Sequence, residues 1–130
     1  LQFGETKIIE HYNSSKNVEL YKDVFMQICL NILNNANEKF IQNEIINSKI
    51  DIYTNDCEDG IELVFLDNAG GIPKDIMDKI FDPYFSTKIG KNGNGLGLYM
   101  TKLVIEEHLN GEISIYNFED GIKLKIKLRV

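Results

Sequence analysis

The sequence predicts an α+β sandwich, a two-layer fold in which helices cover one face of a mixed, mostly antiparallel sheet. Two patterns carry this prediction. Residues 122–130 alternate between aliphatic and cationic side chains, which is typical of a strand with one buried and one solvated face. Residues 21–42 repeat apolar side chains at spacings of three and four, which is typical of a helix with one buried side. A helix and a sheet that each have one apolar face can bury both faces when the helix packs on the sheet.

The remaining elements follow in order, without a linker or an internal repeat. The expected strands are 6–11, a short edge strand at 18–20, 49–54, 61–66, a segment around Ile113 and Ile115, and 122–130, with polar turns at 13–17 and 55–60. The expected helices are 21–42, with Phe25, Cys29, Ile32, Ala36 and Phe40 on its buried side, a short one started by Pro73, and 96–109. In the last strand, five aliphatic residues up to Val130 should face the core. The four cations between them form a solvated face, or alternatively a binding patch.

Length and composition exclude several classes of protein. A chain of 130 residues with 43% hydrophobic residues fits one globular domain. Its longest apolar run, Leu63 to Leu66, falls far short of the about 18 residues that span a membrane. The formal charge of −6 argues against general binding to nucleic acid or to anionic membranes. Cys29 and Cys57 make no disulfide framework, so we expect reduced thiols and a cytoplasmic location.

Glycine is concentrated in one stretch of the chain. Six of the ten glycines fall within residues 70–97, and glycines gather where the backbone turns sharply or approaches a ligand closely. The run 93–98 opens the predicted second long helix, and free amide groups at the start of a helix favour phosphate. Lys88 and Lys91 lie here, and no acidic residue occurs within 85–100. This segment is therefore a locally positive region of an acidic domain, where a polyphosphate could bind. A flexible connector would explain the same glycines.

An amide stripe runs along the predicted first helix. Asn31 and Asn35 are four residues apart and share a face with Gln27 and Glu38. Amide oxygens are hard ligands that suit Mg²⁺, which usually also contacts substrate phosphates. The alternative is a solvent-facing stripe in a chain that is rich in asparagine.

A third candidate segment is 67–72, which directly follows a predicted buried strand. The Asn and Gly residues are explained by a turn. The Asp67 carboxylate at the end of the strand could also accept a hydrogen bond from an exocyclic amine such as that of adenine. The neighbouring glycines would then let a flat base lie against the backbone.

Together these segments resemble the Bergerat-type ATP-binding fold, and most closely the catalytic ATP-binding domain of two-component sensor histidine kinases. Residues 31–36 resemble the asparagine box of that family and 67–72 its first glycine box. Residues 81–85 resemble its phenylalanine box and 93–98 its second glycine box. The order and spacing of the four motifs make the resemblance specific. It covers residues 21–110, and the last strand pair suits the C-terminal hairpin of the family.

The resemblance implies a role for each matching residue. Asn35, with Asn31, would hold Mg²⁺ against the phosphates of ATP. Asp67 would bond the adenine amino group, with Gly71 giving the base room. Residues 82–94 would form a lid over ATP, with Phe81 and Phe85 at its base. The implied nucleotide site comprises Asn31, Asn35, Lys39, Asp67, Gly71, Ile72, Phe85, Lys88, Lys91, Gly93, Gly95, Leu96, Gly97 and Leu98. Asn31 and Asn35 are also its catalytic residues, through positioning and charge neutralisation by the metal.

The residue at position 31 separates the subfamilies. ATP-hydrolysing relatives carry a Glu there as general base, whereas the amide of Asn31 cannot accept a proton at neutral pH. The γ-phosphoryl group is therefore expected to go to a histidine on a partner dimerisation domain. Neither His11 nor His108 has the sequence context of a phosphoacceptor. We expect 1–130 to be the catalytic domain, with the phosphoacceptor and dimerisation helices earlier in the parent protein. Membrane-anchored and unanchored parents are both compatible with this expectation. A response regulator is the indirect partner, and no nucleic-acid or direct membrane contact is expected.

Three departures from the family pattern bear on the site. Ala69 stands where a Gly is frequent, Glu38 where many relatives carry a phosphate-facing Lys, and Ile122 where a Thr is common. Other functions share the fold. An ATPase of the topoisomerase or chaperone kind, a serine kinase of the anti-sigma-factor kind, and a nucleotide-binding module without turnover remain as alternatives.

Overall fold

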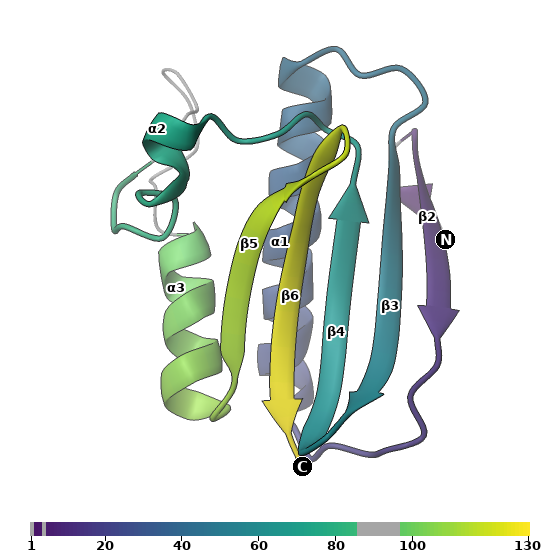
Figure 1. Ribbon diagram of the computed structural model, residues 1–130, viewed down its shortest axis with the longest axis vertical. Helices are drawn as coiled ribbons and strands as arrows, with labels where there is room; N and C mark the ends of the chain where they lie inside the picture. The colour runs from purple at the N-terminus through teal and green to yellow at the C-terminus, as the bar shows by residue number, and fades with distance from the viewer. Residues whose placement is uncertain (1, 4, 86–96) are drawn as a thin grey trace.

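The central sheet is mixed and mostly antiparallel, as predicted. The computed structural model describes residues 2–3, 5–85 and 97–130 (Figure 1). Its strands are β1 (Gln2–Phe3), β2 (Thr6–Tyr12), β3 (Lys49–Cys57), β4 (Gly60–Asp67), β5 (Glu112–Phe118) and β6 (Gly121–Arg129). They lie in the order β1-β2-β3-β4-β6-β5, and among them only the pair β2–β3 is parallel. The helices are α1 (Lys22–Gln42), α2 (Lys74–Met77), α3 (Gly97–Leu103) and the wider turn η1 (Val104–His108). Helix α1 lies behind the sheet in Figure 1, and buried side chains of α1 and η1 share one core cluster with the strands, so the predicted two-layer sandwich is confirmed.

The parallel pair follows from the crossover through α1. The chain leaves β2 at one end of the sheet, returns along α1 and enters β3 in the same direction as β2. The edge strand expected at 18–20 is wrong, because residues 13–21 form an irregular loop. The amides of Ser15 and Lys16 donate to the Asp56 carboxylate instead of to a strand, and Val18 and Leu20 pack on the core from the loop. The hydroxyls of Ser14 and Ser15 also donate to Asp56 and have the largest effect on its pKa. Together these hydrogen bonds lower the pKa of Asp56 to about 2.

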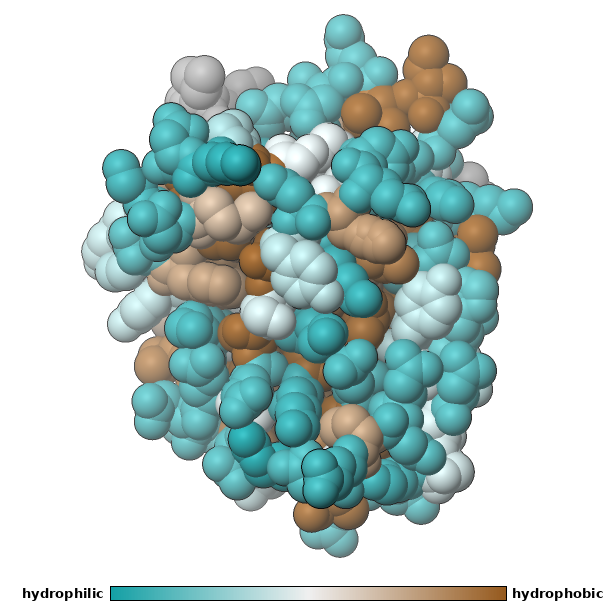
Figure 2. Space-filling model, in the orientation of Figure 1, coloured by the Kyte–Doolittle hydropathy of each residue, from teal (hydrophilic) through white to brown (hydrophobic). Residues whose placement is uncertain are grey.

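The face of the sheet that carries no helix is solvated. Figure 2 shows hydrophilic residues over most of this face, with hydrophobic side chains visible between them. The β6 cations have partners here: Lys125 pairs with Glu62 at 3.7 Å, and Lys127 and Arg129 both reach Asp59. Lys123 lies over the rings of Tyr116 and Phe118. The prediction of a solvated cationic face holds, with three of its four cations paired with acidic neighbours.

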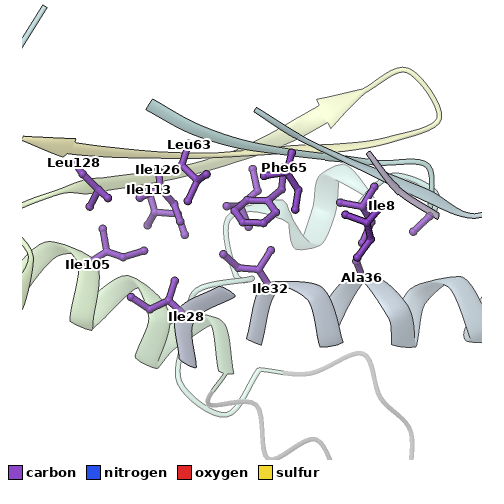
Figure 3. Close-up of a cluster of buried hydrophobic side chains, with 14 of the residues drawn as sticks. Ile8, Ile28, Ile32, Ala36, Leu63, Phe65, Ile105, Ile113, Ile126 and Leu128 are labelled. Atoms are coloured by element: carbon purple, nitrogen blue, oxygen red, sulfur yellow. The ribbon is translucent and has the colours of Figure 1, made fainter. Parts of the chain in front are cut away.

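The core lies between the other face of the sheet and the two long helices (Figure 3). Ile28, Ile32 and Ala36 of α1 point toward the sheet, where they meet side chains such as Phe65 of β4. Ile105 of η1 is fully buried. The expected buried stripe of α1 is shifted by one residue at its start, where Ile28 is buried and Phe25 and Cys29 are half-buried. Burial raises the pKa of the Cys29 thiol to about 11, so it is inert packing.

Three boundaries differ from those expected. Strands β3 and β4 continue to Cys57 and Gly60, so the turn between them is shorter than 55–60. Val130, expected on the buried face of the last strand, is 71% exposed because β6 ends at Arg129. The second long helix widens in its last turn, where the Leu109 amide donates to the Val104 carbonyl at 3.1 Å, five residues earlier.

None of the helices in the described part of the chain combines the length and the apolar character needed to cross a bilayer.

Candidate functional site

A cavity of about 320 Å³ opens between α1 and the sheet, a volume in the range of small-molecule sites. Its floor is apolar and comes from the inner face of the sheet, with Phe65, Leu124 and Ile122 among its members. Its wall along α1 is polar and carries Asn31, Asn35, Glu38 and Lys39. The remaining lining residues include Asp67, Gly70, Ile72, Ile76, Ile80, Phe85, Gly97 and Leu98. An apolar floor faced by a few polar groups is the usual composition of a ligand site.

Asp67 is a half-buried carboxylate that lines this cavity. It ends β4, and its Oδ1 accepts hydrogen bonds from the amides of Ala69 at 3.1 Å and Ile122 at 3.3 Å. Burial raises the pKa of Asp67 above 3.8, while these two hydrogen bonds and the charge of Lys39 oppose the shift. Among the described residues both donors use Oδ1, which leaves Oδ2 to accept from a ligand.

The loop after Asp67 is held by amide side chains. Asn68 accepts from the Lys49 amide at 2.8 Å and donates to the Asn47 carbonyl at 3.1 Å. Asn43, which caps the C-terminus of α1, donates to the Ala69 carbonyl at 2.7 Å. Gly70 adopts φ +92°, a conformation that favours glycine. The loop is therefore fixed by the protein itself, without help from a ligand.

The amide stripe of α1 meets the start of α3. Asn31 Oδ1 accepts from Gln27 Nε2 at 3.0 Å, and Asn31 Nδ2 lies 3.5 Å from Thr101 Oγ1. The buried Thr101 hydroxyl donates to the Gly97 carbonyl at 2.9 Å. Asn35 Nδ2 lies 3.9 Å from where a Cβ of Gly97 would sit. The predicted asparagine box and the last glycine of the second glycine box are therefore neighbours, although 62 positions separate Asn35 from Gly97 in the sequence.

The structure places most of the predicted site residues around one cavity. The described ones that line it are Asn31, Asn35, Lys39, Asp67, Ile72, Phe85, Gly97 and Leu98. Gly71 does not line it, because its Cα faces the side chain of Asn117. Lys88, Lys91, Gly93, Gly95 and Leu96 lie outside the described residues. Phe81 packs against the core under Lys102, whose Nζ lies 5.0 Å from the ring centre.

Sequence reasoning missed two groups of residues at this site. Ile76 and Ile80, on and just after α2, close one side of the cavity. Their spacing of four on a short predicted helix was the available signal. Asn43 and Asn117 hold the loop through contacts between distant parts of the chain. No local pattern marks such contacts.

A known family matches most of this chain. The model of the histidine kinase-, DNA gyrase B- and HSP90-like ATPases matches residues 21–130, which include every described wall of the cavity. The chain belongs to this ATPase family. The motif order, the sheet topology and the family match agree on a Bergerat fold.

Two curated relatives that match this chain are named as histidine kinases. The chain is 34% identical over 102 residues to a putative NtrY-like sensor histidine kinase of Rickettsia prowazekii, covering 78% of the chain and 16% of the relative. It is 34% identical over 109 residues to the signal transduction histidine-protein kinase AtoS of Escherichia coli, covering 83% of the chain and 17% of AtoS. The chain thus spans less than a fifth of the length of these relatives.

Solved structures agree with the family assignment. The catalytic domain of histidine kinase ThkA superimposes with a TM-score of 0.80 at 26% identity, over 95% of this chain and 78% of that one. The mycobacterial sensor histidine kinase MprB shares the fold with a TM-score of 0.80 at 21% identity, over 97% of this chain and 83% of that one. The resemblance to the ATP-binding catalytic domain of a histidine kinase is therefore confirmed.

Proposed function

We propose that this domain binds Mg-ATP and transfers the γ-phosphoryl group to a histidine on a dimerisation domain of the same parent protein, in two-component signalling. The observation that carries the proposal is one cavity lined both by the half-buried carboxylate of Asp67 and by the amide stripe of α1. A cytoplasmic location is part of the proposal, since ATP must reach the site.

Adenine fits the deep end of the cavity. Its flat apolar surface would lie against side chains such as Ile72 and Ile122. Its exocyclic amine would donate to Oδ2 of Asp67, the oxygen that the described backbone amides leave available. Guanine presents a carbonyl oxygen at that position, which a carboxylate repels. Asp67 therefore selects adenine through a single hydrogen bond to its exocyclic amine.

The α1 wall fits Mg²⁺ and phosphate. Asn31 and Asn35 supply amide oxygens, and Mg²⁺ usually binds through few protein ligands while keeping waters and substrate phosphates. When bound, the metal neutralises charge on the phosphates. Gln27 and Thr101 fix the orientation of the Asn31 amide, and Lys39 adds a cation to the same wall.

The residues at the site support transfer rather than hydrolysis. Asn31, at the position of the general base in hydrolysing relatives, cannot accept a proton. The two histidines lie elsewhere: His11 contacts Asp51 at 3.0 Å on the solvated face of the sheet, and His108 lies in η1. The acceptor must then come from another domain. A response regulator is the expected next partner, and ThkA has been solved in complex with the response regulator TrrA.

Phosphoryl transfer is tested by mixing this domain with the dimerisation helices of its parent and ATP labelled at the γ-phosphate. We expect a label on the helices that is lost in acid and retained in base, as for phosphohistidine. An acid-stable label would instead support a serine kinase. Phosphate release by this domain alone would support an ATPase, and no label would contradict the proposal.

Replacing Asn35 by alanine should remove the contribution of Mg²⁺ to ATP binding. In the wild-type domain Mg²⁺ should tighten binding, whereas in the variant most of that gain should be lost, about tenfold in affinity, because a hard oxygen ligand is gone. Titration calorimetry with and without Mg²⁺ measures both values. Asn37→Ala is the matched control, since Asn37 lies on the same helix but does not line the cavity. An undiminished Mg²⁺ effect in Asn35→Ala would contradict the assignment.

A further inference from the structure

Asn117 forms a two-point contact with the loop that borders the cavity. Its Oδ1 accepts from the amide of Ile72 at 2.7 Å, and its Nδ2 donates to the carbonyl of the same residue at 2.8 Å. One side chain thus satisfies both backbone groups of one residue, as a neighbouring strand would. Ile72 itself lines the cavity, so this contact fixes one of its walls.

The packing around this contact leaves little freedom. A Cβ at Gly71 would lie 2.8 Å from Oδ1 and 3.2 Å from Cγ of Asn117. The loop therefore approaches Asn117 as closely as a glycine permits. Asn43 holds the same loop from the side of α1, through the Ala69 carbonyl.

The strand register links Asn117 to Asp67. Asn117 of β5 is the register partner of Ile122 of β6, and the Ile122 amide donates to Asp67 Oδ1. Asn117 thus holds the Ile72 side of the cavity, and its register partner Ile122 holds the Asp67 carboxylate. The distance between these two sides is set by the end of the β5–β6 hairpin.

We propose that Asn117 is a positioning residue for nucleotide binding: by clamping the Ile72 backbone to β5, it sets the width of the base pocket between Ile72 and Asp67. This proposal rests on the proposed function, because ATP binding is what places a purine base in the pocket. It assigns Asn117 no contact with ATP. Loss of the clamp is expected to weaken binding of the base and to leave the contribution of Mg²⁺ unchanged, since the metal is assigned to α1.

The test is a double-mutant cycle between Asn117→Ala and Gly71→Ala, with ATP and adenosine titrated by calorimetry. Asn117→Ala should weaken both ligands by a similar factor of about ten, with the effect of Mg²⁺ on ATP retained. Gly71→Ala should also weaken them, because its methyl group would displace the Asn117 amide. In the double variant that methyl group has room, so binding should be no weaker than in Asn117→Ala alone.

Tyr116→Ala is the control, because Tyr116 neighbours Asn117 on β5 but lies on the solvated face beside Lys123. Melting temperatures without nucleotide separate a loss of folding from a loss of binding. Unchanged affinity in both single variants, or strictly additive losses in the double variant, would overturn the positioning role while the proposed function stands. Failure of the wild-type domain to bind ATP would overturn both.

Discussion

Replacing Asp67 by asparagine is expected to weaken ATP binding by about 100-fold or more. The Asn oxygen can keep the two hydrogen bonds from Ala69 and Ile122. Its NH₂ group then takes the place of Oδ2 and points a donor at the donating amine of adenine. When two donors face each other across the cavity, the hydrogen bond is lost and both groups are left unsatisfied.

The same substitution should leave the folded domain at least as stable at neutral pH. Burial raises the pKa of Asp67 above 3.8, so the folded state binds this proton more tightly than the unfolded state does. For a carboxyl group with a raised pKa, the contribution to stability is present at low pH and is lost as the pH rises through the folded-state value. At pH 7 the ionised group therefore costs stability, and the neutral amide does not carry that cost.

Two measurements check this expectation. Titration calorimetry gives the affinity for ATP, and thermal unfolding without nucleotide gives the stability. The stability advantage of Asp67→Asn should be largest above the raised pKa and should disappear as the pH falls below 3.8, because wild-type Asp67 is then protonated in both the folded and the unfolded state. Asp51→Asn is the control, since Asp51 binds His11 and Lys49 on the solvated face. A large loss of stability together with binding would show that Asp67 acts in folding instead.

The sequence predicted which residues lie together around the cavity better than it predicted the boundaries of the elements. The four motifs gave the order of the site residues, and the structure places Asn35 beside Gly97 and both around the cavity that holds Asp67. These residues could be grouped from the sequence because they are of unusual types for their positions. An amide stripe on an apolar helix and glycines before a helix both stand out locally.

The failures arose where tertiary contacts override local pattern. Val18 and Leu20 look like strand residues, yet the loop that carries them is held by Asp56 and reaches the core without pairing. Asn117 comes two residues after Ile115 of a predicted strand whose register was unknown, so its contact with Ile72, 45 residues away, could not be anticipated. Predicting such contacts requires the register of β5 on β6, which alternation of side chains alone does not provide.

Replacing Gly121 by alanine is expected to damage both stability and binding, because this glycine lies against Asp67. A Cβ at position 121 would sit 1.8 Å from the Asp67 carbonyl oxygen and 2.7 Å from its Oδ1. Backbone cannot yield to such a contact without separating β6 from β4, and we expect a loss of about 3 kcal/mol in the free energy of unfolding. The movement also withdraws the Ile122 amide from Asp67, so ATP affinity should fall as well.

Gly60→Ala is the matched control for Gly121→Ala. A Cβ at Gly60 would lie 1.9 Å from the Leu128 carbonyl oxygen, which is the same kind of backbone clash at the opposite end of the β4–β6 pair. Both variants should therefore lose comparable stability in urea unfolding, while only Gly121→Ala should lose ATP affinity when titrated well below its unfolding midpoint. Equal losses of affinity in the two variants would mean that binding depends on the sheet as a whole. A loss of ATP affinity in Gly121→Ala alone would show that the affinity depends on the geometry of Asp67.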